Sequence, residues 1–595
     1  MTAKYVIGID LGTTNSVVAY AALDEEDAEV QLLRIPQLVA EHTVEAHSSL
    51  ASFAFLGIGK PNGSLDMPWA DSRDYCVGEF ARRSAAENAE RTISAAKSWL
   101  SHSGVDRRAP ILPWQTPAKV EKLSPVAASQ LYLEHLVAAW NADMPETPLA
   151  EQQVVLTVPA SFDAVARELT REAALAAGLP ENLVLLEEPQ AAVYAWLAQS
   201  GDSWRQSLAV GDQLLVCDIG GGTTDLTLIG IEEQDGELSL QRQAVGNHLL
   251  VGGDNMDLTL AHQVSEQFAE KGTKLDPWQA VSLWHSCRAA KETLLAEDGP
   301  EKHTISVLGR GSKLIGGTVS VEVDRSEVGK LMVEGFLPEC TLNDAPARQR
   351  ASGFQQLGLP FESDTGVTRH VAAFLTAQAS DASVRQPSHV LFNGGVFKSK
   401  VLQQRFVQVL NSWFEGQETQ PLPGTRDLDH AVAIGAAHYG RVKAQGGIRI
   451  RGGVAHSYYV GIETAGLAIP GAPRPLNALC VVPMGMEEGT EVDVASGEIG
   501  LVHGEQAQFR FFSSALRKDD QPGDLLQSWD ENELEETTAL TATLDADSSV
   551  TEPYVPVRFQ SRITELGMFE LWCIAVQGEG SWKLEFNVRD GVEEA

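Results

Sequence analysis

Residues 10–14 read Asp-Leu-Gly-Thr-Thr, directly after the apolar run Tyr5–Ile9 (YVIGI). A short apolar run that ends in a glycine turn is typical of a central strand buried on both faces. In the turn, Gly12 lets the backbone bend tightly and bring N–H groups against a phosphate, and the two threonines add hydroxyl donors. Asp10 is suited to hold the waters around Mg²⁺, because this ion keeps most of its hydration shell. The stretch therefore predicts a phosphate-binding turn with a metal-organising carboxylate.

The same pattern returns at residues 215–224, which read LVCDIGGGTT. An apolar strand again ends in an aspartate, Asp218, and a glycine turn again precedes paired threonines. The following segment, 225–231 (DLTLIGI), is a predicted hairpin partner strand. One such turn would be explained equally well as an ordinary glycine-rich loop. Two matched copies instead predict two related lobes that face one ligand.

Two other nucleotide-binding motifs are missing from the sequence. It contains no G-x-x-x-x-G-K-[ST] loop and no G-x-G-x-x-G at the start of a helix. Neither a P-loop nor a dinucleotide-binding site is therefore indicated. Phosphoryl transfer needs a metal, a positioned water and charge stabilisation. The two carboxylates and the two donor loops are able to supply these.

Composition excludes several classes of partner. The net charge is −36, and no Lys/Arg-rich tract is present, which argues against nucleic acid. The six cysteines lie tens of residues apart, which suits neither a zinc site nor a compact disulfide framework. We find no apolar stretch of membrane-spanning length and no signal-peptide pattern at the N-terminus. We therefore expect a protein without a membrane partner, located in the cytoplasm.

Strand and helix patterns alternate over residues 1–445, which predicts an α/β fold. Ser161 is expected to cap a helix that ends at Gly178. Residues 341–366 are interpreted as an insertion within this part of the chain. The other expected strands are 154–158, 214–217 and 390–392, and the expected helices are 162–177, 188–199 and 428–443.

The pattern changes after Gly447. Short alternating runs, such as 491–494, 506–511 and 555–559, are separated by Gly, Pro and Asp and predict an all-β, sandwich-like module. Residues 525–544 are polar and acidic, so we expect a long loop or insertion there. Its acidic stretch Asp530–Glu536 is expected to be a solvated loop.

Several of these stretches together resemble the 70-kDa heat-shock chaperone family, within the superfamily of actin and the sugar kinases. They span most of residues 5–440. The stretches that carry the resemblance are 7–16 (IGIDLGTTNS), 157–160 (TVPA), 188–192 (EPQAA), 217–225 (CDIGGGTTD), 252–254 (GGD), 290–291 (AK), 394–395 (GG) and 429–437 (DHAVAIGAA).

The resemblance implies a two-lobed, actin-like nucleotide-binding domain for ATP and Mg²⁺. It implies that Asp10 and Asp218 organise Mg²⁺ through water and that Glu188 positions the attacking water. It places Thr223 near the γ-phosphate. The residues that it implies for nucleotide binding are Gly12, Thr13, Thr14, Asn15, Gly220, Gly221, Gly222, Gly252, Gly253, Lys291, Gly394, Gly395 and Asp429.

The sequence departs from the family at the cation that reaches the γ-phosphate. The family has a lysine in a VG-x-x-A-K stretch, and the corresponding stretch here is Val77–Arg82. Arg82 keeps the charge, but a planar guanidinium is not interchangeable with an ammonium group at a transition-state contact. Arg83 and Lys97 are the alternatives for this role. On the nucleoside side, Arg288 stands where the family has glutamate and Leu295 where it has serine.

The resemblance also implies an order of domains. We expect an ATPase domain over residues 1–446, a linker over 447–458 and a β-rich, substrate-binding-like domain over 459–595. The family's Leu-rich acidic linker is replaced by GGIRIRGG between 446 and 453. Few residues follow the predicted sandwich, so we expect no helical lid over it.

Three functions fit these patterns. The first is an ATP-dependent chaperone-like protein that hydrolyses ATP slowly and binds unfolded or client polypeptide, in the family with J-domain co-chaperones and nucleotide-exchange factors. The second is a nucleotide-binding scaffold or co-chaperone with negligible ATPase activity, which Arg82 and the altered linker favour. The third, a small-molecule kinase of the same superfamily, fits the β-rich C-terminal region poorly.

Overall fold

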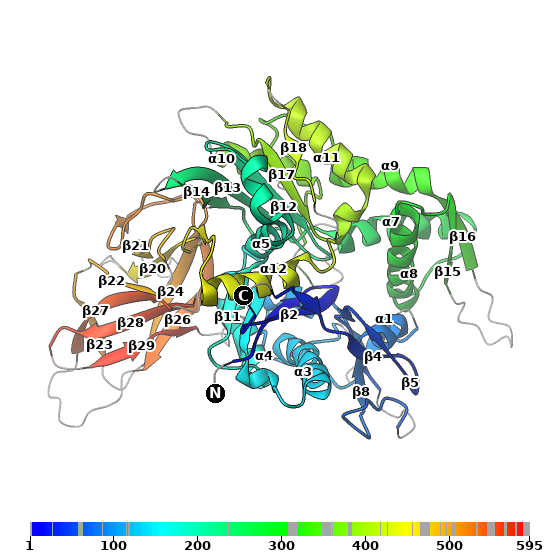
Figure 1. The fold of residues 1–595 in the computed structure, drawn as a ribbon, viewed down its shortest axis with the longest axis horizontal. Helices are drawn as coiled ribbons and strands as arrows, with labels where there is room; N and C mark the ends of the chain where they lie inside the picture. Colours follow the sequence, from blue (N-terminus) through cyan, green and yellow to red (C-terminus); the bar gives the residue numbers. More distant parts are fainter. Residues whose placement is uncertain are drawn as a thin grey trace, which may run out of the picture.

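The computed structural model is a mixed α/β structure in which strands and helices alternate over the first part of the chain (Figure 1). It describes residues 3–586 except 26–27, 58–62, 86, 115, 117–119, 235–236, 308–318, 348–358, 360, 379–383, 417, 425–426, 455, 464–475, 488, 496, 503–505, 531–532, 544–553, 565–567 and 578–579. Much of the expected insertion at 341–366 therefore lies outside the described residues.

The first sheet is built around β1 (Tyr5–Leu11). β1 pairs antiparallel with β2 (Asn15–Ala22) and parallel with β10 (Gln153–Val158). The residues of β1 and β10 are almost all buried, as their unbroken apolar runs predict. The other strands of this sheet are β3 (Gln31–Leu32), β6 (Leu50–Ala51) and β11 (Val184–Glu187).

The second sheet repeats this arrangement around β12 (Gln213–Ile219). β12 pairs antiparallel with β13 (Thr224–Gln234), which confirms the predicted hairpin, and parallel with β17 (His389–Asn393). Each sheet therefore presents a tight turn between its first two antiparallel strands. The other strands of the second sheet are β14 (Glu237–Val245), β18 (Gln420–Pro421) and β19 (Ile450–Arg451).

Two helices, α5 (Glu188–Ser200) and α12 (Ala431–Gln445), cross between the two sheets. They pack against each other at the centre of the molecule in Figure 1, and α12 also packs against β1. A Cβ atom at Gly435 of α12 would lie 1.7 Å from the carbonyl oxygen of Ala191 in α5. Only glycine allows this close approach of the two helix backbones. The two lobes are therefore joined through a tightly packed helix pair.

The remaining elements of these two lobes surround the sheets. On the first sheet's side they are β4 (Ile35–Ala40), β5 (Thr43–His47), β7 (Ala54–Leu56), β8 (Tyr75–Val77), β9 (Thr92–Ile93), α1 (Glu79–Ser84), α2 (Ala96–Leu100), α3 (Pro125–Asp143) and α4 (Ala164–Ala176). On the second sheet's side they are α6 (Trp204–Ser207), α7 (Gly253–Glu270), α8 (Pro277–Leu295), β15 (Lys302–Val307), β16 (Val319–Asp324), α9 (Arg325–Phe336), α10 (Val367–Ala377), the 3-10 turn Gly395–Lys398 and α11 (Lys400–Ser412).

The described residues from 457 to 586 form strands only, in two sheets beside the first lobe (Figure 1). Tyr458, Phe511 and Phe569 stack between these sheets with ring centroids 5.4–5.5 Å apart. One sheet holds β20 (Ser457–Glu463), β21 (Leu476–Val482), β24 (Gln506–Ser514), β25 (Leu525–Leu526), β26 (Glu535–Thr543) and β30 (Glu585–Phe586). The other holds β22 (Thr490–Asp493), β23 (Ile499–Val502), β27 (Tyr554–Ile563), β28 (Phe569–Ala575) and β29 (Ser581–Lys583).

Two local predictions are wrong. The helix after Val158 begins at Ala164, and its cap is Asp163, whose side chain accepts from the N–H of Ala166 at 2.7 Å, so Ser161 is not the cap. The expected loop at 525–544 contains β26. β26 is a strand because its alternate residues Leu540 and Ala542 turn inward to the core, while the acidic residues at its start stay exposed.

The part of the chain that the structure describes contains no disulfide and no helix suited to cross a membrane. All six cysteines lie in the described part of the chain, and none forms a disulfide. Among the described residues, no helix is both long enough and apolar enough to cross a bilayer.

Candidate nucleotide-binding site

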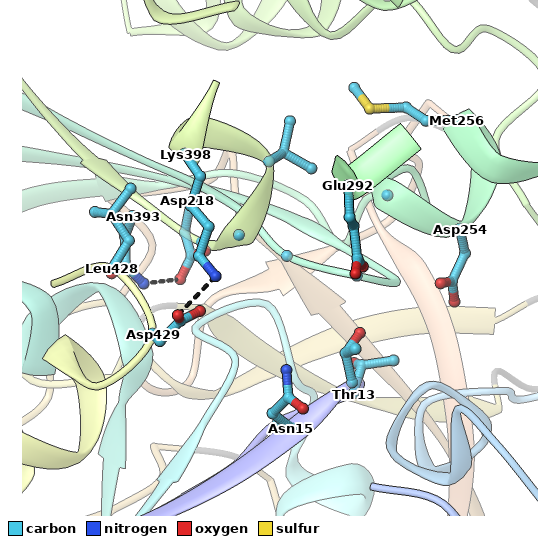
Figure 2. A pocket seen from close by; sticks show the side chains of 18 of the residues that line it. Thr13, Asn15, Asp218, Asp254, Met256, Glu292, Asn393, Lys398, Leu428 and Asp429 are labelled. Carbon is cyan, nitrogen blue, oxygen red and sulfur yellow. Dashed lines mark hydrogen bonds and ion pairs between the residues drawn. The ribbon is translucent and has the colours of Figure 1, made fainter. Parts of the chain in front are cut away.

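The two glycine turns meet at a deep cavity of about 620 Å³ between the lobes. The β1–β2 turn enters from the first lobe, and the β12–β13 turn enters from the second (Figure 2). A Cβ atom at Gly221 would lie 2.1 Å from the hydroxyl oxygen of Thr14, so the two turns almost touch. Most of the predicted site residues line this cavity: Asp10, Gly12, Thr13, Thr14, Asn15, Arg82, Glu188, Asp218, Gly220, Gly221, Thr223, Gly253, Lys291, Gly394, Gly395 and Asp429.

Two of the predicted glycines lie behind the cavity wall rather than in it. A Cβ atom at Gly222 would meet the hydroxyl oxygen of Ser98 at 2.5 Å, and one at Gly252 would meet the carbonyl oxygen of Gly220 at 2.8 Å. Both positions leave no room for a side chain. We infer that these glycines let the backbones of neighbouring segments pack behind the turns.

A buried lysine lies among the carboxylates at the floor of the cavity. The Lys97 ammonium group forms an ion pair with Glu188, and their side chains are only 8% and 11% exposed. The hydroxyl of Thr157 donates to Asp10 at 3.2 Å. On the other lobe the amide of Asn393 donates to Asp218 at 2.7 Å, as Figure 2 shows. The floor therefore holds two buried acids, Glu188 and Asp218, the half-buried Asp10 and the buried base Lys97.

The electrostatics of this floor favour a further cation. Burial raises the pKa of Asp10 to about 7, with Glu188 adding to the rise and Lys97 opposing it. Burial and the charge of Glu188 raise the pKa of Asp218 to about 8, although the bond from Asn393 opposes the shift. Each shift shows that a buried carboxylate lacks full charge compensation. A cation bound near Asp10 and Asp218 would supply that compensation.

The donor set fits Mg²⁺ held through water rather than directly. Among the described residues, no group of three or more His, Cys, Asp or Glu side chains is arranged to hold a metal ion by itself. Mg²⁺ usually keeps several waters and is bound by one or two carboxylates together with substrate phosphates. Asp10 and Asp218, on opposite turns of the cavity, fit this second arrangement.

Arg82 occupies a different position from Lys97. Arg82 is in α1, its side chain is 37% exposed, and it pairs with Glu79 at 2.8 Å. It lines the cavity, but its charge is already shared with a neighbouring acid in its own helix. Lys97, in α2, is the cation buried beside Glu188. The sequence offered Lys97 only as an alternative for this role.

The nucleoside side of the cavity carries an internal ion network. Arg288 pairs with Asp254 and, at 2.8 Å, with Asp257, and Lys291 pairs with Asp257 at 2.6 Å. The Lys291 ammonium group also donates to the carbonyl of Gly253 at 2.9 Å. Lys291 therefore fixes the start of α7 behind the second turn. Arg288, which departs from the family pattern, lines the cavity, and its charge is paired with these acids.

Three further groups at the cavity were not predicted. Asn393 comes directly before the predicted Gly394, so its place at the end of β17 was the signal that could have identified it. Lys398 pairs with the predicted Asp429 at 2.6 Å across the cavity mouth (Figure 2). Glu292, one residue after Lys291 on α8, also lines the cavity, and helical spacing alone did not show which side it faces.

Comparison with known proteins agrees with this geometry. A family profile described as Hsp70 protein matches residues 68–336. Chaperone protein HscA of Enterobacter sp. (strain 638) is 31% identical to this chain over 278 residues, which are 44% of this chain and 38% of that relative. Chaperone protein DnaK of Thermosipho africanus (strain TCF52B) is 30% identical over 270 residues, which are 45% of this chain and 37% of that relative.

The chain is therefore similar to Hsp70 proteins over residues 68–336. The matches span well under half of the length of these relatives. This similarity implies a two-lobed, actin-like fold, and the paired sheets and turns described above have this form. The predicted resemblance to this family is thereby confirmed.

A second polar cluster joins the two lobes to the segment before the C-terminal strands. Arg242 of β14 forms ion pairs and hydrogen bonds with Glu187 of the first lobe and with the carbonyls of Gly452 and Gly453, the Gly452 bond being 3.0 Å long. Arg167 also pairs with Glu187, at 2.9 Å. Burial alone would raise the pKa of Glu187, but the two arginines outweigh it and hold this pKa below its usual value.

This segment is bound as a short strand. Its residues Ile450 and Arg451 form β19, which pairs parallel with β14, and the N–H of Ile450 donates to the hydroxyl of Tyr194 at 2.9 Å. Glu187 directly precedes Glu188 at the cavity floor. Arg242 thus connects the strand before the C-terminal region to the residue beside a site carboxylate.

Proposed function

We propose that this chain binds ATP with Mg²⁺ in the cavity between its two glycine turns and hydrolyses it slowly. The observation that carries the proposal is the close approach of Gly221 and Thr14, which brings the two glycine turns together beside the acids Asp10 and Asp218. Backbone N–H groups of the turns suit phosphate oxygens. Residues 1–446 form the ATPase domain in this proposal.

Hydrolysis would use the groups at the cavity floor. When bound, Mg²⁺ would neutralise phosphate charge, and Asp10 and Asp218 would hold it through water. Glu188 accepts from Lys97 and would orient the attacking water, and the Lys97 ammonium group would stabilise charge on the phosphate. Thr223 and the threonines of the first turn would fix the terminal phosphate for attack.

We further propose that residues 459–595 form a separate β domain that binds unfolded or client polypeptide, joined by the linker 447–458. The two packed sheets of β20–β30 support a sandwich. The relatives are named chaperone proteins, which supports client binding and the assistance of a J-domain co-chaperone and a nucleotide-exchange factor. A strand-like peptide laid against an exposed sheet edge is a common form of such binding.

The turnover prediction compares the purified chain with its Asp10→Asn variant. The natural chain is expected to release phosphate from ATP in the presence of Mg²⁺, and Asp10→Asn is expected to lower this rate at least about 100-fold, because it removes a carboxylate charge from the metal position. Phosphate release under saturating Mg·ATP measures both. If the natural chain binds ATP but its rate equals that of the variant, the chain is a nucleotide-binding scaffold with negligible ATPase activity.

The linker prediction concerns Arg242→Ala. This change leaves Glu187 with one arginine and removes the donors to Gly452 and Gly453, so β19 is expected to detach from β14. Breaking a buried ion pair costs about 3–5 kcal/mol, which is enough to release a two-residue strand. Hydrogen exchange of the Ile450 and Arg451 amides is expected to become at least about tenfold faster.

Arg451→Ala is the matched control for this measurement, since Arg451 is in the same strand and its side chain is exposed. Its exchange is expected to match that of the natural chain. Equal protection of these amides in Arg242→Ala and Arg451→Ala would show that Arg242 does not hold the linker.

A further inference from the structure

Ser161, which is not the helix cap that its position suggests, makes a different contact. Its hydroxyl lies 2.6 Å from Oδ1 of Asp225, and its backbone N–H donates to the same oxygen at 3.2 Å. Asp225 is in β13, directly opposite Asp218 in the β12–β13 ladder. Both side chains of the contact are buried. A residue of the first lobe therefore holds a carboxylate of the second lobe.

His248 extends the contact between Ser161 and Asp225 away from the nucleotide cavity. The Ser161 hydroxyl lies 2.7 Å from Nδ1 of His248, and Nε2 of His248 lies 2.9 Å from the hydroxyl of Ser101. Ser161, His248 and Ser101 all border a polar cavity of about 90 Å³, whose other wall is formed by C-terminal residues such as Ser513. A chain of hydrogen bonds thus runs from Asp225 to the junction with the C-terminal strands.

The direction of these hydrogen bonds follows from the groups present. Because a backbone N–H can only donate, Oδ1 of Asp225 is an acceptor, and the short distance to Ser161 is typical of a hydroxyl that donates to a carboxylate. Burial lowers the pKa of His248 to about 4, so its ring is neutral near pH 7. Because the one proton of the Ser161 hydroxyl goes to Asp225, Nδ1–H of His248 donates to Ser161, and the Ser101 hydroxyl shares its one proton between Nε2 of His248 and the carbonyl of Ser98, which lie 2.9 Å away on either side.

Asp225 lies where its orientation affects the candidate site. Its Oδ2 accepts from the hydroxyl of Thr223 at 3.5 Å, and Thr223 lines the nucleotide cavity. Lys97 and Asp225 also interact electrostatically, since each affects the pKa of the other. A turned Asp225 carboxylate would move the Thr223 hydroxyl and change the field at Lys97. Both groups face the place proposed for the terminal phosphate.

We propose that Ser161 and His248 are positioning residues for phosphoryl transfer, which act by holding the Asp225 carboxylate toward Thr223 and Lys97. The proposal rests on the proposed ATPase function. Neither residue lines the nucleotide cavity, so they affect the chemical step and not the affinity for ATP. Misplacement of a reacting group by about 1 Å can cost about 100-fold in rate.

The first test is a single-turnover measurement on the full chain with radiolabelled ATP and Mg²⁺. Ser161→Ala is expected to lower the hydrolysis rate about 10- to 100-fold and to leave the Kd for ATP within about twofold. Ser161→Thr, which keeps the hydroxyl, is expected to retain the rate within about threefold. Ser103→Ala, on the wall of the same 90 Å³ cavity but outside the hydrogen-bond chain, is the matched control and is expected to behave as the natural chain.

The outcomes separate the positioning role from the proposed function. If the natural chain does not hydrolyse ATP in a single turnover, the ATPase proposal fails and this one fails with it. If the natural chain hydrolyses ATP and Ser161→Ala does so within about twofold of it, only the positioning role is overturned. Equal loss in Ser161→Ala and Ser161→Thr would also overturn it, because the hydroxyl would then not matter.

A spectroscopic test does not depend on any variant. The ¹⁵N spectrum of the His248 imidazole at pH 7 is expected to show a protonated Nδ1 and an unprotonated Nε2. In the opposite tautomer Nδ1 would accept from the Ser161 hydroxyl, which could then no longer donate to Asp225. That result would contradict the proposed positioning of Asp225 by Ser161.

Discussion

Replacing Lys97 with methionine is expected to lower the single-turnover rate of ATP hydrolysis by about 10²–10³-fold, the usual cost of losing one group that stabilises transition-state charge. Lys97 is the buried cation at the cavity floor and forms an ion pair with Glu188. Methionine keeps much of the side-chain length and removes the charge. Glu188 would then lose the partner that favours its ionised form, because Lys97 lowers its pKa against the effect of burial.

Arg82→Met is the variant whose hydrolysis rate is compared with that of Lys97→Met. Arg82 is partly exposed and pairs with Glu79, so its loss is expected to lower the rate less than about tenfold. Thermal unfolding of both variants shows whether each remains folded. A larger loss in Arg82→Met than in Lys97→Met would assign the phosphate cation to Arg82, as the family resemblance implies.

The second large effect concerns the joint between the lobes. Gly435→Ala is expected to destabilise the chain by about 3 kcal/mol or more, at or above the upper end of the usual cost of overpacking. The new Cβ atom would lie 1.7 Å from the Ala191 carbonyl oxygen, so α5 and α12 would have to separate. Because α5 begins at Glu188, ATP affinity is expected to fall as well.

Gly335→Ala is the matched control for this change, since Gly335 is also helical and a Cβ atom there would meet no heavy atom within 4 Å. It is expected to leave stability unchanged or raise it by up to about 1 kcal/mol, because alanine favours a helix over glycine. Denaturant unfolding followed by tryptophan fluorescence measures both variants. Equal stability of Gly435→Ala and Gly335→Ala would contradict the close packing of α5 and α12.

The sequence was sufficient where a local pattern controls the structure. The repeated strand, turn and threonine pattern predicted the β12–β13 hairpin, since an apolar strand that ends in a tight turn has few other arrangements. The predicted strands at 5–9, 154–158, 214–217 and 390–392 all lie within strands of the structure. Here each of these apolar runs, bounded by turn residues, lies in a strand whose residues are mostly buried, as is typical of central strands.

The sequence was insufficient where a distant residue competes for a side chain. Ser161 and Asp163 are both good helix caps, and Asp163 takes that role because Asp225, from the other lobe, binds Ser161. Arg82 stands at the position of the motif's lysine, yet Lys97 is the cation buried beside Glu188. Local spacing contains no information about which of two nearby cations faces a carboxylate that comes from another helix.

The C-terminal region shows a third limit of prediction from the sequence. Residues 535–543 begin with two glutamates, and their polar composition predicted a loop, whereas they form β26 between β24 and β30. A strand with one buried face needs only every second residue to be apolar. Leu540 and Ala542 meet that need, and a composition average over the segment does not detect it.

The central claim, that ATP binds where the two glycine turns meet, is tested most directly by calorimetric titration of Mg·ATP into the full chain and into Gly221→Val. A side chain at Gly221 would collide with Thr14 and close the space between the turns. We expect one binding site per chain in the natural protein and at least about 100-fold weaker binding in the variant. Binding of equal affinity in both proteins, or no binding of Mg·ATP to the natural protein, would contradict the claim.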